Sequence, residues 1–254
     1  MPNTPSPEFG AEPPVLGLAA DHPAGHCIAA HSHDSHQVIH AASGVLRVTS
    51  EEAVWVVPPG RALWMPGGRE HALQCHTAVA LRTIYLRRAP RGFAPVCRVY
   101  SLSPLLREIL VRLADDPAAA GNPHLQALLF QELTASEALP LALPQPREPR
   151  LKRLTARLQD DPQDARSLDH WALELGLSRR SLIRRFRAET GLTFREWRRQ
   201  ARLLAALERL GSGAPVTTVA FEVGYDSVSA FIAAFREALG TTPGRYFAEG
   251  DSNR

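Results

Sequence analysis

Long apolar runs are absent from this chain of 254 residues, and so is the composition of a secretory leader. No apolar segment approaches the roughly 18 residues that a membrane-spanning helix requires. The first 20 residues contain five prolines and lack a basic start followed by a hydrophobic segment. These absences predict a cytoplasmic protein without a membrane segment, in which residues 1–22 form a flexible tail.

Cysteine is scarce as well, because the chain contains only Cys27, Cys75 and Cys97. Their number is odd, and no two of them have Cys-x-x-Cys spacing. This pattern predicts reduced thiols and argues against a disulfide framework.

Net charge is low overall, but it is distributed unevenly. The formal charge is +3, yet residues 147–254 contain 19 basic and 14 acidic residues, against 10 and 12 in the rest of the chain. A protein that contacts phosphate groups needs such a local basic excess. The length also suffices for two domains of ordinary size.

The spacing of apolar residues changes along the chain and divides it into parts. Short runs rich in valine, isoleucine and tryptophan, broken by proline and glycine, indicate a β-sandwich or barrel over 23–100. Leucines at helical spacing predict a helical segment at 101–139, which could pack on the barrel or mediate dimerisation. A proline-rich linker is expected at 140–150, and 151–248 is predicted to be helical throughout. The expected fold is therefore α+β with two domains.

Two copies of one helix-turn-helix pattern lie in the C-terminal part, at Ser167–Phe186 and Val216–Phe235. Each copy has an apolar-periodic helix, a glycine at the turn and a second helix that ends on phenylalanine. Glycine tolerates the left-handed conformation that such a turn needs. The expected N-caps of the second helices are Ser178 and Asp226. Two such units in tandem suggest helices laid into successive major grooves of DNA.

Arginines dominate the outer face of the second helix in the first copy. The candidate DNA contacts there are Arg179, Arg180, Ile183, Arg184 and Arg187. Arginine can donate two parallel hydrogen bonds to guanine or clamp a phosphate; the alternative is a solvated charged face. In the second copy the outer positions Val228, Ser229 and Ala233 are small, which predicts less base reading. Arg236 and Arg245 are candidate phosphate contacts.

From Leu151 to Phe247 the chain resembles the AraC/XylS family of bacterial transcription regulators. The resemblance rests on the second repeat, which continues through Phe-Arg to the Gly-Thr-Thr-Pro ending at Pro243. The family implies a DNA-binding unit of two subdomains whose recognition helices enter adjacent grooves and bend the site. Its base-contacting positions correspond here to Arg180, Ile183, Arg184, Val228, Ser229 and Ala233. Members of the family are regulators and not enzymes.

The N-terminal part has two motifs of its own. The first has Gly25, His31-Ser-His33, Gln37 and Gly44; the second has Gly60, Pro66-Gly-Gly68, His71 and Cys75. Both match the spacing of the motifs of cupins, small β-barrels with a double-stranded β-helix fold. Glutamine stands where cupins usually have glutamate, and cysteine where they usually have asparagine. The resemblance implies an N-terminal sensor barrel.

Four residues of these motifs are candidate metal ligands: His31, His33, Gln37 and His71. The first three share a parity, so on one strand they would point to one face, and His71 would come from another strand. Three imidazoles and an amide oxygen suit a divalent transition metal, with nickel, zinc, cobalt, manganese and iron left open. The alternative is a pocket without metal, in which the histidines bind each other or an organic effector. We expect the remaining histidines of this region to lie at the surface or beside the site.

The sequence as a whole predicts a homodimeric transcription regulator that binds double-stranded DNA and senses a metal or a small molecule. Two alternatives remain open. One is a regulator that answers to an organic effector without metal; the other is a metal-dependent cupin enzyme fused to a DNA-binding domain.

Overall fold

The computed structural model describes residues 15–90, 93 and 95–251, with side chains up to Ala248. The chain forms two compact units. The first contains the residues up to Ser50 together with Trp55–Leu141, and the second contains Glu51–Val54 and the chain from Ala142 onward. Each unit is described by itself. No helix among the described residues is both long and apolar enough to cross a membrane.

The first unit contains a sandwich of two β-sheets, in which the neighbours β1 and β8, β3 and β6, and β4 and β7 pair antiparallel. In spatial order the first sheet contains β1 (Val15–His22), β8 (Val79–Leu86), β3 (His36–Ser43), β6 (Arg61–Met65), β9 (Arg98–Ser101) and β10 (Ala138–Leu139). The second contains β5 (Ala53–Val57), β4 (Leu46–Thr49), β7 (His71–Cys75) and β2 (Cys27–His31). Strand β7 alternates buried and more exposed residues, as expected when one face lies against the other sheet.

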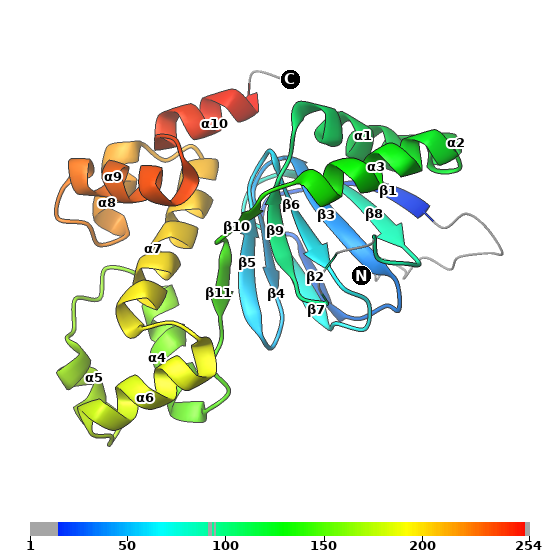
Figure 1. The fold of residues 1–254 in the computed structure, drawn as a ribbon. Helices are drawn as coiled ribbons and strands as arrows, with labels where there is room; N and C mark the ends of the chain where they lie inside the picture. The colour runs from blue at the N-terminus through cyan, green and yellow to red at the C-terminus, as the bar shows by residue number, and fades with distance from the viewer. Residues whose placement is uncertain (1–14, 91–92, 94, 252–254) are drawn as a thin grey trace. The chain divides into compact units, whose positions relative to one another are not determined.

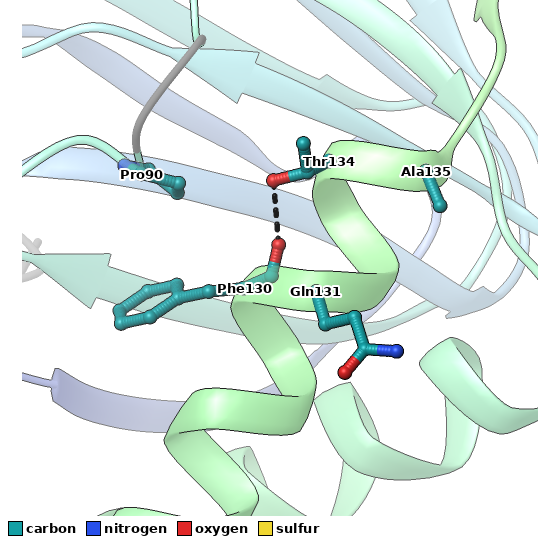
Figure 2. A pocket seen from close by; sticks show the side chains of 5 residues that line it. All are labelled: Pro90, Phe130, Gln131, Thr134 and Ala135. Atoms are coloured by element: carbon teal, nitrogen blue, oxygen red, sulfur yellow. Dashed lines mark hydrogen bonds between the residues drawn. The ribbon is translucent and has the colours of Figure 1, made fainter.

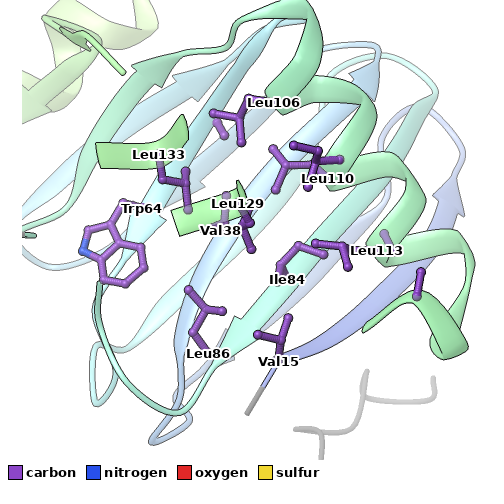
Figure 3. Packing of buried hydrophobic residues seen from close by; sticks show 14 residues of the cluster. Val15, Val38, Trp64, Ile84, Leu86, Leu106, Leu110, Leu113, Leu129 and Leu133 are labelled. Atoms are coloured by element: carbon purple, nitrogen blue, oxygen red, sulfur yellow. The ribbon is translucent and has the colours of Figure 1, made fainter. Parts of the chain in front are cut away.

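Helices cover the outer face of the first sheet (Figure 1). They are α1 (Pro104–Asp115), α2 (Pro117–Ala120) and α3 (Pro123–Ala135). Leu110 and Leu113 of α1 face Val38 and Ile84 of the sheet in one buried cluster (Figure 3). The segment predicted to be helical at 101–139 contains helices between Pro104 and Ala135, but Ser101 ends β9 and Ala138–Leu139 form β10. Its leucine stripe packs within its own chain. A second subunit is not needed to bury that stripe, so dimerisation through it stays a prediction.

The exposed side of α3 borders an open hollow (Figure 2). Phe130 and Pro90 form its apolar part, and Gln131, Thr134 and Ala135 complete its lining. The Thr134 hydroxyl donates a hydrogen bond of 2.7 Å to the carbonyl of Phe130, so it is already engaged within the helix.

Two predicted boundaries are wrong. Residues 15–22 do not belong to a flexible tail, because they form β1 and pair along their whole length with β8; residues 1–14 lie outside the described residues. The linker predicted at 140–150 is not free of structure either. It includes β11 (Ala142–Pro144), and α4 begins at Pro149. Proline at the first position of a helix is tolerated because its missing N–H needs no partner there.

From Ala142 onward the second unit is helical apart from β11. Its helices are α4 (Pro149–Asp160), α5 (Leu168–Glu174), α6 (Arg179–Thr190), α7 (Phe194–Gly211), α8 (Val216–Glu222), α9 (Val228–Leu239) and α10 (Pro243–Asp251). Helix α7 runs between two groups of shorter helices (Figure 1). Its first turn is fixed by a capping box, in which Thr193 and Glu196 bond to each other's backbone. The predicted α+β fold of two domains is confirmed.

Both helix-turn-helix units have the predicted turn. Gly176 and Gly224 adopt the left-handed conformation, with φ of +63° and +84°, and Ser178 caps α6 as expected. The predicted cap Asp226 is wrong. Ser227 takes that role, because its side chain accepts the hydrogen bond from the backbone N–H of Ala230.

Candidate functional site

Three histidines from different parts of the sandwich meet between the two sheets. His31 ends β2 and lies directly opposite His71 of β7, at a place where the register of the two strands shifts. Such an irregularity re-aims side chains next to functional sites. His33 lies beyond the end of β2, in the turn that leads to β3. The predicted single strand for His31, His33 and Gln37 is therefore wrong, because the chain crosses from one sheet to the other between them.

The imidazoles nevertheless converge as predicted. One ring nitrogen from each of His31, His33 and His71 lies within 4.8 Å of the others. The ring centroid of His71 is 4.6 Å from that of His31 and 5.3 Å from that of His33. Among the described residues this is the one group of three or more potential ligands that could hold a metal ion.

Backbone carbonyls orient all three rings in the same way. The Nδ1 atoms of His31, His33 and His71 lie 2.8–2.9 Å from the carbonyl oxygens of residues 29, 35 and 69. A nitrogen that faces a carbonyl oxygen must carry the proton, so the neutral ring keeps its lone pair on Nε2. Metal-binding histidines in proteins are fixed by the same kind of contact.

Burial makes His71 less basic than an ordinary histidine. Its side chain is 1% exposed, and its Nε2 atom is buried without a hydrogen-bond partner. Burial, and to a smaller degree the neighbouring His31 and His33, lower the pKa of His71 to about 4, although the carbonyl of Arg69 opposes this shift. The ring is therefore neutral and available as a ligand near pH 7.

Gln37 brings an amide to the same place from β3. Its Oε1 atom lies 3.0 Å from Nε2 of His33, and its Nε2 atom donates a 2.8 Å hydrogen bond to the hydroxyl of Thr83. That hydroxyl donates in turn to the carbonyl of Val38. The amide nitrogen is thus occupied, which leaves the amide oxygen directed at the histidines.

Two residues of β8 that the sequence motifs do not include also line this site. Thr83 holds Gln37, and the ring of Tyr85 packs edge-on against His33 with centroids 5.1 Å apart. Burial raises the pKa of Tyr85 to about 12, so its hydroxyl stays protonated. Alternation along β8 places 83 and 85 on the face opposite Ile84, but only the pairing of β8 with β3 puts them beside Gln37.

Cys75 and His40 are both buried. Cys75 shares the inward face of β7 with His71, and burial raises the pKa of its thiol to about 11, which keeps it protonated and unreactive. His40, which was expected at the surface or beside the site, is not at the surface. It is completely buried, and its Nδ1 atom lies 2.8 Å from the carbonyl oxygen of Arg61.

The basic face predicted on the first repeat is exposed in the structure. Arg179, Arg180, Arg184 and Arg187 of α6 are all exposed, and the Ile183 side chain between them is 45% exposed. Arg179 forms an ion pair of 2.8 Å with Asp169 of α5. Arg180 and Arg184 form no ion pair or hydrogen bond with the residues that the structure describes.

The corresponding face of α9 carries little charge. Ser229 and Ala233 are exposed and Val228 is half-buried, while Arg236 is exposed near the end of the helix. On the opposite face Phe231 and Phe235 are buried. Arg245 lies exposed on α10.

Both halves of the chain match known protein families. A family described as the AraC-like ligand binding domain matches residues 12–134, and a helix-turn-helix domain family matches residues 171–249. The chain is 36% identical over 222 residues to the HTH-type transcriptional regulator NimR of Escherichia coli K12, covering 86% of this chain and 81% of NimR.

Two solved structures are also similar. Fatty-acid-bound ToxT from Vibrio cholerae has a TM-score of 0.40 at 11% identity, covering 91% of this chain and 94% of ToxT. The DNA-binding domain of AdpA in complex with a target DNA has a TM-score of 0.38 at 30% identity, covering 40% of this chain and 93% of that domain. The curated relatives are named as regulators, in line with the expectation that the chain is not an enzyme. The narrower likeness to cupins stays a prediction. The chain belongs to the AraC family of DNA-binding transcriptional regulators, with an AraC-like ligand-binding domain ahead of its helix-turn-helix domain.

Proposed function

We propose that the ligand-binding domain of this regulator binds a divalent transition metal through His31, His33, His71 and Gln37. The observation that carries the proposal is the buried Nε2 atom of His71, which has no hydrogen-bond partner and faces two more imidazoles. An unpaired polar atom in a protein interior costs roughly 1–3 kcal/mol, and a bound cation removes that cost.

The donor set suits such an ion. Imidazole is a good ligand for zinc, nickel, iron and related metals, and an amide oxygen adds a harder donor. All four donors are neutral, so a bound ion keeps its double charge and can accept a further oxygen or anionic ligand. In this way the metal itself, or a molecule held by it, would serve as effector.

Regulation requires that the effector favour one arrangement of the protein over another. Only a difference in affinity between the arrangements can shift DNA binding, and by linkage DNA shifts effector affinity by the same factor.

Metal content of the protein purified without a histidine tag tests the proposal. We expect about one equivalent per chain, lost in His71→Ala and in His31→Ala. The control is His124→Ala, which removes an exposed histidine from α3. Absence of bound metal after incubation with nickel, zinc, cobalt, manganese and iron in turn would contradict the proposal.

A second candidate is a small organic effector bound without metal. The match to a ligand-binding family and the edge-on packing of Tyr85 against His33 favour it. In that case metal-free protein would change its DNA affinity on addition of an organic compound, and the His71→Ala variant would lose the response.

For DNA contact we propose that α6 reads bases through Arg180, Ile183 and Arg184, while Arg179, Arg187 and Arg236 contact phosphates. Helix α9, with Val228, Ser229 and Ala233, would add affinity more than sequence reading. We also propose that the regulator is a homodimer; sedimentation of a monomer at micromolar concentration would contradict this.

A further inference from the structure

One arginine of the connecting helix α7 contacts both helix-turn-helix subdomains. Arg202 is half-buried, and its Nε atom donates a 3.0 Å hydrogen bond to the carbonyl of Pro162, in the loop between α4 and α5. Its guanidinium carbon lies 5.8 Å from the ring centroid of Tyr225, at the turn between α8 and α9. That distance is within reach of a cation–π attraction.

The turn of the second subdomain approaches the first subdomain closely at the same place. A Cβ atom added to Gly224 would lie 2.6 Å from Nη2 of Arg202 and 2.9 Å from the carbonyl oxygen of Pro162. Side chains do not tolerate contacts this short, and φ of +84° disfavours any residue with a Cβ. Gly224 therefore serves two purposes: it makes the turn and it lets the two subdomains touch.

The guanidinium is partly withdrawn from water at this contact. Burial lowers the pKa of Arg202, and the charge of Arg198 adds to the effect. Desolvating a charge is costly, so the carbonyl and the ring must compensate for lost water. An arginine can do both at once because its planar group donates from its edge and stacks through its face.

We propose that Arg202 and Gly224 form a lock that holds the recognition helices α6 and α9 at one separation and angle. The domain then accepts its two DNA segments at a single spacing. Arg202 is a positioning residue in this proposal, because it acts through the two helices and not by touching DNA. A fixed geometry lowers the entropy lost on binding but penalises any operator of different spacing.

The test compares operators that differ only in spacing. The first probe is a duplex selected from a random library by the full wild-type chain. The second is a copy with one base pair inserted between the segments that α6 and α9 contact. Wild type should bind the inserted duplex about tenfold more weakly, whereas Arg202→Ala should lose less than about threefold between the two duplexes. For each protein the ratio of its affinities for the two duplexes is compared, which cancels any general loss of affinity.

Arg199→Ala is the matched control. It removes the same charge from the same helix, and its ion pair is with Glu237 of α9, in the second subdomain. We expect it to keep the wild-type spacing penalty. Arg202→Lys should lie between wild type and Arg202→Ala, because the ammonium can reach the carbonyl but lacks the flat face.

Three results would overturn the lock: no spacing penalty in wild type, the full penalty in Arg202→Ala, or an equal loosening in Arg199→Ala. Circular dichroism melts establish that each variant is folded at the assay temperature. Should Arg202→Ala unfold, the ratio measured with Arg202→Lys decides, and an unchanged ratio there counts against the proposal.

Discussion

The Nε2 atom of His33 and the Oε1 atom of Gln37 lie 3.0 Å apart. While the ring is neutral, neither atom donates a hydrogen to the other, because Nδ1 of His33 faces a carbonyl and the amide nitrogen binds Thr83. Two lone pairs at this distance repel each other. Donor atoms at right angles, each about 2.1 Å from a metal, are separated by about 3.0 Å. A shared cation would therefore turn the repulsion into a binding interaction.

Replacing the amide by a carboxylate should separate folding from metal binding. Without metal, Gln37→Glu places a charge in a buried position and cannot donate to Thr83, so we expect a loss of about 3 kcal/mol in the free energy of unfolding. With metal, the anionic oxygen should tighten binding by on the order of tenfold. Urea unfolding of the metal-free protein and metal titration measure the two effects; weaker metal binding would speak against Gln37 as a ligand.

His40 should make the ligand-binding domain sensitive to acid. Burial, with smaller contributions from Arg107 of α1 and Arg82 of β8, lowers its pKa from 6.5 to about 4, although the carbonyl of Arg61 opposes this. Between these values the unfolded chain takes up a proton that the folded chain does not. Stability is therefore complete above pH 6.5 and falls as the pH drops toward 4, by about 3 kcal/mol at most.

The His40→Gln variant tests this pH dependence, since glutamine can still donate to the carbonyl of Arg61 but does not titrate. Its free energy of unfolding should fall less steeply between pH 6.5 and 4 than that of wild type. The exposed His124→Gln serves as control and should follow the wild-type curve. Parallel curves for all three proteins would show that His40 does not cause the acid sensitivity.

Arg184 should contribute to sequence recognition. Its side chain is exposed on α6 and has no partner among the described residues, so it is free to reach a base. We expect Arg184→Ala to weaken binding to a selected duplex by about 1–3 kcal/mol and to relax the preference at one position. Ser229→Ala on α9 should cost less than about 0.5 kcal/mol. Gel-shift titrations at fixed salt compare the two; a uniform loss on all sequences would indicate a phosphate contact by Arg184.

Leu110 should stabilise the ligand-binding domain from within one chain. It is fully buried between α1 and the first sheet, so Leu110→Ala should cost about 2–5 kcal/mol of unfolding free energy. The loss should not depend on protein concentration. Leu105, at 48% exposed, is the matched control on the same helix, and Leu105→Ala should be nearly neutral. A cost that grows on dilution would instead indicate that Leu110 lies at a subunit interface.

The C-terminal domain was the more predictable half. Apolar periodicity predicted its helices and glycine predicted both turns, because these signals act over a few residues. The cap of α9 shows the limit of such reasoning: Asp226 and Ser227 are both good caps, and the path of the chain after Gly224 selects between them.

By itself the sequence determined the candidate ligands and the helix-turn-helix units, since residue type and local periodicity are sufficient to identify both. It could not determine where the leucine stripe of α1 packs, which side chain holds Gln37, or what Arg202 touches. Those depend on contacts between residues far apart in the chain. The tertiary structure decided these contacts in three places. They are the register shift that sets His31 opposite His71, the pairing of β3 with β8, and the close approach of Gly224 to Pro162. Each of these contacts forms only when whole helices and strands pack together, because only then do segments that are distant in sequence come within reach of one another.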